Sequence, residues 1–156
     1  MKNNVQYNSK SQFYPEYLKE IGSSGILVSR DGTLIINKNT GKVVHPKTFA
    51  NTNYLQLTTP ICIGLKKFQY VHELVVAAWE PTACWGVKKP RIHHCDQNTM
   101  NNNIDNLVVL SDGDHIKLHH HIGKRPVSKT LINELLINLK KDAAWDWFDN
   151  AINNIE

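Results

Sequence analysis

The chain has few cysteines, and they do not form a pair with metal-binding spacing. Cys62, Cys84 and Cys95 are scattered, and the sequence contains no C-x-x-C motif. An odd, scattered set argues against a disulfide framework and against a zinc site built from cysteines. We therefore expect all three to behave as small buried hydrophobic residues.

Long hydrophobic runs are also lacking. No apolar segment approaches the roughly 20 residues that a membrane-spanning helix requires. The first residues, Met1-Lys2-Asn3-Asn4, are polar and do not resemble a signal peptide. These absences predict a soluble, cytoplasmic protein without a membrane partner.

Basic residues are scarce at the end of the chain. Residues 130–156 contain two basic and five acidic side chains, whereas the 156-residue chain as a whole carries a net charge of +4. The remaining residues form a modestly basic surface, which suits a polyanion such as a nucleic acid. A solvated surface without any partner fits the same charge equally well. The length and a hydrophobic content of 41% indicate one globular domain, with room for a small extension.

The first half of the chain shows β patterning. Asp31-Gly32 between two apolar runs is a strong hairpin signal, and Gly64 provides a later turn. Only the segment from Pro15 to Ile21 reads as a short helix, with proline in its first turn. The expected antiparallel sheet consists of residues 26–28, 33–36, 42–44, 54–58 and 68–71.

The second half predicts helices around one buried strand. Residues 107–110 are apolar, and Ser111 and Asp114 form a capping-box pattern that opens a helix ending near Gly123. Ser128 opens a further helix with an apolar stripe, and a less regular apolar pattern extends to Ile155. We expect this C-terminal part to pack on the core. A homodimer through the C-terminal helix is the alternative.

Four histidines are placed so that three of them can share a metal ion. His115 and His119 are four residues apart, so they lie on one face of the expected helix. His93 and His94 are adjacent, and on an extended strand they point in opposite directions. Only one of this pair can therefore join the metal, and the other is left as a possible base. An incidental histidine-rich tract is the competing interpretation, because His120 and His121 extend the run.

Three imidazole ligands would leave at least one coordination position open, which is typical of catalytic and not of structural metal sites. The remaining histidine can stay neutral near pH 7 and accept a proton from water. A metal ion combined with such a base can hydrolyse a phosphodiester bond. Lys88, Lys89 and Arg91 precede the strand and could dock a phosphate, although a charged surface loop is the simpler alternative.

Three segments together resemble the HNH endonucleases, a family with a ββα-metal fold, in the type found in phage and mobile elements. They are VHELVVAAWEP (71–81), IHHCDQNTMNNNIDNL (92–107) and LSDGDHIKLHH (110–120). The resemblance implies a helix over residues 72–79, which periodicity alone does not assign. It also implies an α+β fold, with a small N-terminal antiparallel β region, a ββα-metal motif and a C-terminal helix.

Residue roles follow from the resemblance position by position. His94 matches the general base, His93 matches the preceding metal ligand, and His115 and His119 match the ligands on the helix. Asn106 matches the middle asparagine of the family motif, which orients the base and is counted among the catalytic residues. Asp96 matches a carboxylate that supports the loop. The glycine that usually follows this carboxylate is Gln97 here, which predicts a wider turn.

The predicted function is a metal-dependent DNA endonuclease that nicks or cuts double-stranded DNA with one divalent ion (Mg, Mn, Zn, Ni or Co), in a bacterial or phage-infected cell. The alternatives are a non-catalytic nucleic-acid-binding module with a structural metal and a regulatory or structural protein with an incidental histidine tract. The expected domains are a DNA-contacting region (1–70), a nuclease core (71–123) and a helical extension (124–156). The expected DNA-binding residues are Lys88, Lys89, Arg91, Lys117, Lys124 and Arg125.

Overall fold

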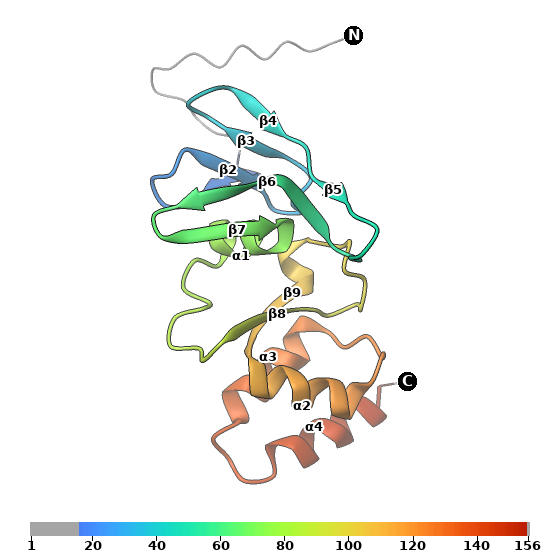
Figure 1. Cartoon of the computed structure of the whole chain (residues 1–156). Coiled ribbons are helices and arrows are strands. Elements are labelled where there is room, and N and C mark those ends of the chain that lie inside the picture. Colours follow the sequence, from blue (N-terminus) through green and yellow to red (C-terminus); the bar gives the residue numbers. More distant parts are fainter. Residues whose placement is uncertain (1–15, 156) are drawn as a thin grey trace. The chain divides into compact units, whose positions relative to one another are not determined.

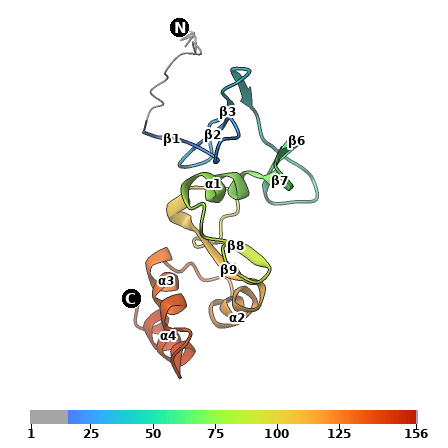
Figure 2. The same cartoon turned by 90° about the vertical axis from the view of Figure 1, so that its left-hand side faces the viewer.

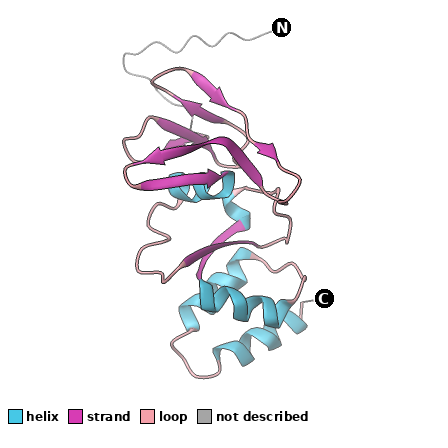
Figure 3. Ribbon diagram, viewed as in Figure 1, coloured by secondary structure: helices cyan, strands magenta, loops and turns pink. Residues whose placement is uncertain are grey.

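The computed structural model describes residues 16–155 and has the expected α+β fold (Figures 1 and 3). The chain divides into two compact units, Met1–Pro81 and Thr82–Glu156. Strands dominate the first unit, and the second contains a ββα arrangement followed by helices (Figure 3). The three-part organisation with boundaries at 70 and 123 stays a prediction.

The first unit begins with a four-stranded antiparallel sheet in the order β1 (Leu18–Glu20), β2 (Ile26–Ser29), β3 (Ile35–Asn37) and β4 (Lys42–Val44). The hairpin predicted at Asp31-Gly32 is confirmed, since Val28 pairs with Ile35. Asp31 Oδ1 accepts hydrogen bonds from Ser29 Oγ at 2.8 Å and from the Thr33 backbone N–H at 3.0 Å. The side chain of Asp31 therefore determines the shape of this turn.

The helix predicted over residues 15–21 is wrong where the structure describes it. Leu18–Glu20 is the strand β1, which pairs with β2, and Pro15 lies outside the described residues. Leu18 packs against Leu27 and Ile36 in a small buried cluster. Tertiary pairing thus outweighs a weak local signal.

A second antiparallel sheet contains β5 (Lys47–Thr48), β6 (Leu55–Ile63) and β7 (Lys66–Tyr70). The predicted pairing across Gly64 is confirmed, but the unit has two sheets where we expected one. The helix implied by the resemblance is also present as α1 (Val71–Trp79). Glu73 Oε2 accepts the backbone N–H of Tyr70 at 3.1 Å, which stabilises the start of α1.

The second unit is built on the two-stranded sheet of β8 (Pro90–His94) and β9 (Leu107–Ser111). A 3-10 turn, η1 (Ile104–Asn106), leads into β9, and α2 (Asp112–Ile122) follows it directly. Ser111 Oγ accepts the backbone N–H of Asp114 at 3.1 Å, so the predicted cap of α2 is confirmed. The helix ends at Gly123, as the sequence predicts.

Two helices complete the second unit, α3 (Lys129–Asn138) and α4 (Ala144–Asn153), where we expected a single C-terminal helix (Figure 2). Ala143 adopts a positive φ of 61° immediately before α4, and this left-handed residue separates the two helices. The stripe on α3 is core, since Ile132 and Leu135 are buried. The predicted homodimer stays a prediction. The shared core contains Cys95, Val108, Leu110, Leu118, Ile122, Val127, Ile132, Leu135, Ala144, Phe148 and Ile152.

The prediction that all three cysteines are buried holds only for Cys95. Cys62 is exposed on β6, and Cys84 is partly buried. Cys62 pairs with Lys67 in the β6–β7 ladder, where its side chain points to solvent. Within the described residues, none of the helices has the length and apolar character needed to cross a membrane.

Candidate functional site

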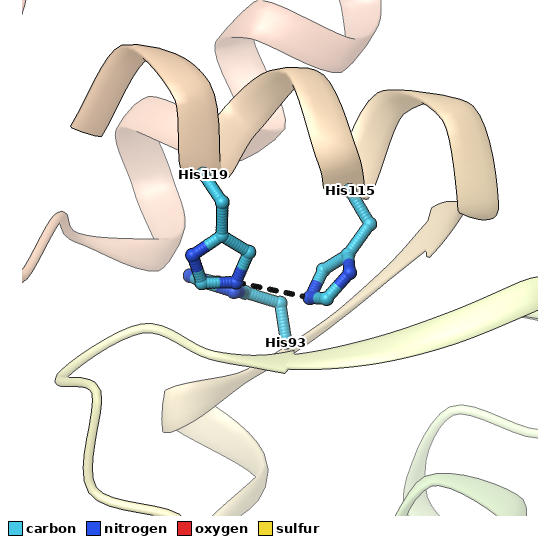
Figure 4. Close-up of side chains that lie close together, drawn as sticks. All are labelled: His93, His115 and His119. Atoms are coloured by element: carbon cyan, nitrogen blue, oxygen red, sulfur yellow. Dashed lines mark hydrogen bonds between the residues drawn. The ribbon is translucent and has the colours of Figure 1, made fainter. Parts of the chain in front are cut away.

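Three histidines from β8 and α2 converge in the second unit (Figure 4). The Nε2 atoms of His115 and His119 are 3.2 Å apart. The ring centroid of His93 lies 4.9 Å from that of His119 and 5.5 Å from that of His115. One ligand atom from each residue can be chosen so that all three lie within 4.8 Å of one another. The structure therefore brings together the three residues that were expected to hold a metal.

Local structure explains how the sequence builds this cluster. The cap at Ser111 sets the start of α2, and the buried side chains of Leu118 and Ile122 hold one face of the helix on the core. His115 and His119 lie one turn apart on the adjacent face. The β8–β9 ladder positions the remaining member, because His93 pairs with Val108.

The cluster has the features that a divalent metal requires. His93 Nε2 is buried and has no hydrogen-bond partner among the described residues, an unusual state for a ring nitrogen. Two nitrogens bound to one tetrahedral ion at about 2.1 Å would lie about 3.4 Å apart. The observed 3.2 Å between His115 and His119 is close to that distance. These imidazoles fit a metal ion whose identity the geometry does not select.

The electrostatics keep two of these ligands, His93 and His115, in the neutral form that binds metals. Burial, together with the charges of His119, His115 and His94, lowers the pKa of His93 to about 3. Burial, His119 and Arg91 also lower the pKa of His115. At neutral pH both imidazoles therefore have a nitrogen lone pair available for a metal.

His94 points away from this cluster, as alternation along β8 predicts. It is 5% exposed, and its Nε2 lies 3.1 Å from Asn102 Oδ1. Burial lowers the pKa of His94, although the hydrogen bond with Asn102 and the charge of Asp96 act in the opposite direction. The ring is therefore neutral near pH 7 and able to accept a proton.

Asn106 closes the loop between the strands, and its side chain bonds to the loop itself. Its Nδ2 donates to Asp96 Oδ1 and to the Asn101 carbonyl, both at 2.9 Å. Its Oδ1 accepts the Asp96 backbone N–H at 2.9 Å. Asp96 also accepts the Asn98 N–H at 2.8 Å and Asn101 Nδ2 at 2.7 Å. Asp96 and Asn106 thus form the centre of a closely hydrogen-bonded loop.

Asn102 is the residue that sequence reasoning missed. It is 2% exposed, and it is the asparagine whose side chain reaches His94. Asn101, Asn102 and Asn103 are consecutive and chemically identical, so the sequence does not distinguish them. Only the backbone path decides which of them points inward.

The wider turn predicted at Gln97 is not present. Gln97 adopts φ 64°, the conformation that glycine adopts easily, and its N–H donates to the His94 carbonyl at 3.0 Å. Its Nε2 also donates to the Arg125 carbonyl at 3.3 Å. The dense hydrogen bonding of the loop therefore maintains a tight turn with a strained non-glycine residue.

Basic side chains around the site have different surroundings. Lys88 and Lys89 are exposed in the loop before β8. Arg91 is also exposed, but its Nε donates to Asp112 Oδ1 at 2.8 Å. This ion pair links the start of β8 to the first residue of α2.

The remaining cations predicted to bind DNA lie further along the chain. Lys117 on α2 and Lys124 after it are exposed. Arg125 Nη1 donates to the Ile152 carbonyl at 3.2 Å and to Asn153 Oδ1 at 3.3 Å. Arg125 thus has a structural contact with the end of α4 in addition to its predicted role.

The histidines that follow the cluster are not part of it. His120 is exposed, and His121 Nδ1 lies 2.7 Å from Asp149 Oδ1. The ring of His121 stacks on Trp145 with a centroid distance of 4.7 Å. His121 therefore joins α2 to α4, and the run His119–His121 is not a uniform histidine tract.

The fold matches a solved structure, that of the HNH homing endonuclease I-HmuI, described as "DNA binding and cleavage by the HNH homing endonuclease I-HmuI". The TM-score is 0.52 and the sequence identity is 24%, over 72% of this chain and 63% of that chain. This chain thus matches less than two thirds of the length of that endonuclease. The sequence matches no protein-family model and no curated protein. The likeness establishes an HNH-like fold, so the resemblance seen in the sequence is confirmed at the level of the fold.

Proposed function

We propose that this protein is a metal-dependent DNA endonuclease that hydrolyses phosphodiester bonds. The observation that carries the proposal is the convergence of His93, His115 and His119. A separate neutral histidine, His94, follows His93 on β8 and contacts Asn102 of the next loop. The proposal is supported by the fold shared with I-HmuI, an HNH homing endonuclease that binds and cleaves DNA. A metal cluster and a neighbouring base together provide the two parts of a hydrolytic site.

His93, His115 and His119 would hold the divalent ion. When bound, such an ion neutralises charge that develops on the phosphate and stabilises the leaving oxygen. Three nitrogen ligands suit Zn, Ni, Co or Mn, whereas Mg would need phosphate oxygens to complete its shell. The cation in an assay therefore has to be varied.

His94 would act as the general base that takes a proton from the attacking water. Asn102 would be its direct positioning residue, and Asn106 and Asp96 would act one step further away by holding the loop. His94 is only 5% exposed. For water to reach it, the loop between β8 and β9 or the imidazole ring would shift when DNA binds. Catalytic hydrogen bonds commonly reach their working geometry only in the substrate complex.

DNA would be bound by the exposed cations of the second unit and by the β-rich first unit. Lys88, Lys89, Lys117 and Lys124 are exposed, so their ammonium groups can reach phosphates. Arg91 and Arg125 would contribute through the parts of their guanidinium groups that do not contact Asp112 or α4. Double-stranded DNA is the proposed substrate.

The burial of His94 favours a second candidate, a nucleic-acid-binding module with a purely structural metal. A chelator distinguishes the two functions. Removal of a structural metal should unfold the second unit, while removal of a catalytic metal should stop cleavage and leave the fold largely intact. The presence of three imidazole ligands, where a structural zinc has four ligands, favours the catalytic role.

The decisive experiment is cleavage of supercoiled plasmid across Mg, Mn, Zn, Ni and Co by the wild type and by two variants. We expect His94→Ala to keep metal and DNA binding but to cleave about 100- to 10,000-fold more slowly, because general-base catalysis is lost. His119→Ala should lose metal affinity in calorimetry. His120→Ala is the matched control, because His120 is an exposed neighbour outside the cluster. Undiminished cleavage by His94→Ala would remove His94 as the base.

A further inference from the structure

An exposed tryptophan lies in the loop between α1 and β8. Trp85 is 76% exposed, the highest value among the four tryptophans of the chain. Trp147 is 39% exposed, and Trp79 and Trp145 are partly buried. A packed aromatic side chain buries about 150–250 Å² of surface. Most of the Trp85 side chain instead remains in contact with water.

The loop around Trp85 has a defined turn structure. The Trp85 backbone N–H donates to the Thr82 carbonyl at 3.0 Å, and the Val87 N–H donates to the Cys84 carbonyl at 3.3 Å. Gly86 adopts φ 70°, which glycine permits without strain. The indole is therefore presented on a hydrogen-bonded turn.

This loop is attached to the helix that carries two of the metal ligands. The Asp112 N–H donates to the Lys88 carbonyl at 3.4 Å, and Asp112 also accepts from Arg91. Asp112 is the first residue of α2 and precedes His115 by three positions. The loop is thus hydrogen-bonded to the N-terminal end of α2, one turn before His115.

The charge of the loop complements a nucleic acid. Residues 82–91 contain Lys88, Lys89 and Arg91 and no acidic residue, and all three cations are exposed. An exposed aromatic ring beside phosphate-binding cations is the combination that binds the bases and backbone of nucleic acids. A protein partner that used the indole alone would have no need of this cationic run.

We propose that Trp85 stacks on a base of the bound DNA, while Lys88 and Lys89 contact the adjacent phosphates. This inference rests on the proposed function, because it takes DNA as the partner. Stacking is tolerant of sequence, since every base presents a π-face. Trp85 thus contributes affinity and the position of the strand without selecting a base.

The test compares Trp85→Ala, Trp85→Phe and Lys88→Gln/Lys89→Gln with the wild type, and Trp147→Ala is the control for loss of an exposed tryptophan. Affinity for duplex and single-stranded oligonucleotides is measured by fluorescence anisotropy in EDTA, over a salt series. We expect Trp85→Ala to weaken binding about 5- to 150-fold. The salt slope, that is, the change in the logarithm of the binding constant with the logarithm of the salt concentration, should stay unchanged. Trp85→Phe should restore most of the lost affinity. The double lysine variant should reduce the salt slope by about two.

A DNA probe containing 2-aminopurine gives an independent readout, since its fluorescence changes when an aromatic ring stacks on it. We expect that change with the wild type and Trp147→Ala but not with Trp85→Ala. Equal binding and equal probe fluorescence for Trp85→Ala and the wild type overturn the stacking role, as does a wild type that binds no DNA.

The nuclease proposal can fail separately from the stacking proposal. If the wild type binds DNA through Trp85 but cleaves plasmid with none of the metals, stacking stands and the nuclease proposal fails. If Trp85→Ala cleaves plasmid and reaches half of its maximal rate at the same DNA concentration as the wild type, the nuclease proposal stands and stacking fails.

Discussion

At the scale of single residues, two adjacent histidines on β8 have different surroundings. His93 faces the imidazoles of α2, and His94 contacts Asn102. Alternation along a strand made this division predictable. The contact with Asn102 was not predictable, because three consecutive asparagines offer the same chemistry and only the loop conformation distinguishes them.

Asn102 provides the first residue-scale prediction. Asn102→Ala removes the hydrogen-bond partner of His94 Nε2, so we expect plasmid cleavage to slow with little change in the DNA concentration at half-saturation. Asn102→Asp keeps an acceptor oxygen and should recover part of the rate. A loss of about 10- to 100-fold in the maximal rate is expected for a positioning residue of this kind.

Asn103→Ala is the matched control, since the side chain of Asn103 caps η1 by accepting the Asp105 backbone N–H at 3.0 Å. Circular dichroism of each variant checks that the fold persists. If Asn102→Ala changes only the DNA concentration at half-saturation and leaves the maximal rate unchanged, the positioning role of Asn102 is contradicted.

At the scale of elements, the loop between β8 and β9 depends on one carboxylate. Burial raises the pKa of Asp96, but hydrogen bonds from Asn101, Asn98 and Asn106 outweigh that effect and leave the pKa lowered. A carboxyl whose folded pKa is lowered contributes stability above its unfolded value near 3.8, and this contribution is lost as pH falls through the folded pKa.

Asp96→Asn tests this dependence on pH. We expect the variant to be less stable than the wild type at pH 7, because a neutral amide accepts weaker hydrogen bonds than a carboxylate. The difference should shrink as pH falls below about 3.8, where the carboxyl of the unfolded wild type takes up a proton before that of the folded protein. Urea unfolding at several pH values measures it. Asp142→Asn, in the exposed turn before α4, is the control, and a difference independent of pH would contradict the role of the Asp96 charge.

At the scale of the whole molecule, the metal ligands belong to one of two compact units. His93, His115 and His119 all lie within Thr82–Glu156. A ligand stabilises only the folded unit that binds it, by about 2.7 kcal/mol at a concentration 100 times its dissociation constant. Metal binding should therefore affect the second unit more than the first.

Hydrogen exchange with and without the bound metal measures this effect. We expect slower exchange in β8, β9 and α2 when metal is present, and little change in β2, β3 and α1. His119→Ala should abolish the difference because a ligand is lost. Equal protection of both units would show that the metal effect is not confined to the second unit.

The sequence by itself determined the elements whose signals are local. The hairpin at Asp31-Gly32, the caps at Ser111 and Ser128 and the i, i+4 histidine pair depend on nearby residues, and the structure contains them all. The HNH resemblance also came from contiguous segments, which is why the fold could be predicted before the structure was known.

Tertiary structure decided the features that depend on distant residues. The strand at Leu18–Glu20 exists because β2 offers a pairing edge, and two sheets form because pairing is chosen among distant segments. The tight turn at Gln97 and the selection of Asn102 depend on hydrogen bonds that close only when the whole loop folds. Such contacts leave no local sequence pattern, because their free energy arises only when distant residues have already been brought together.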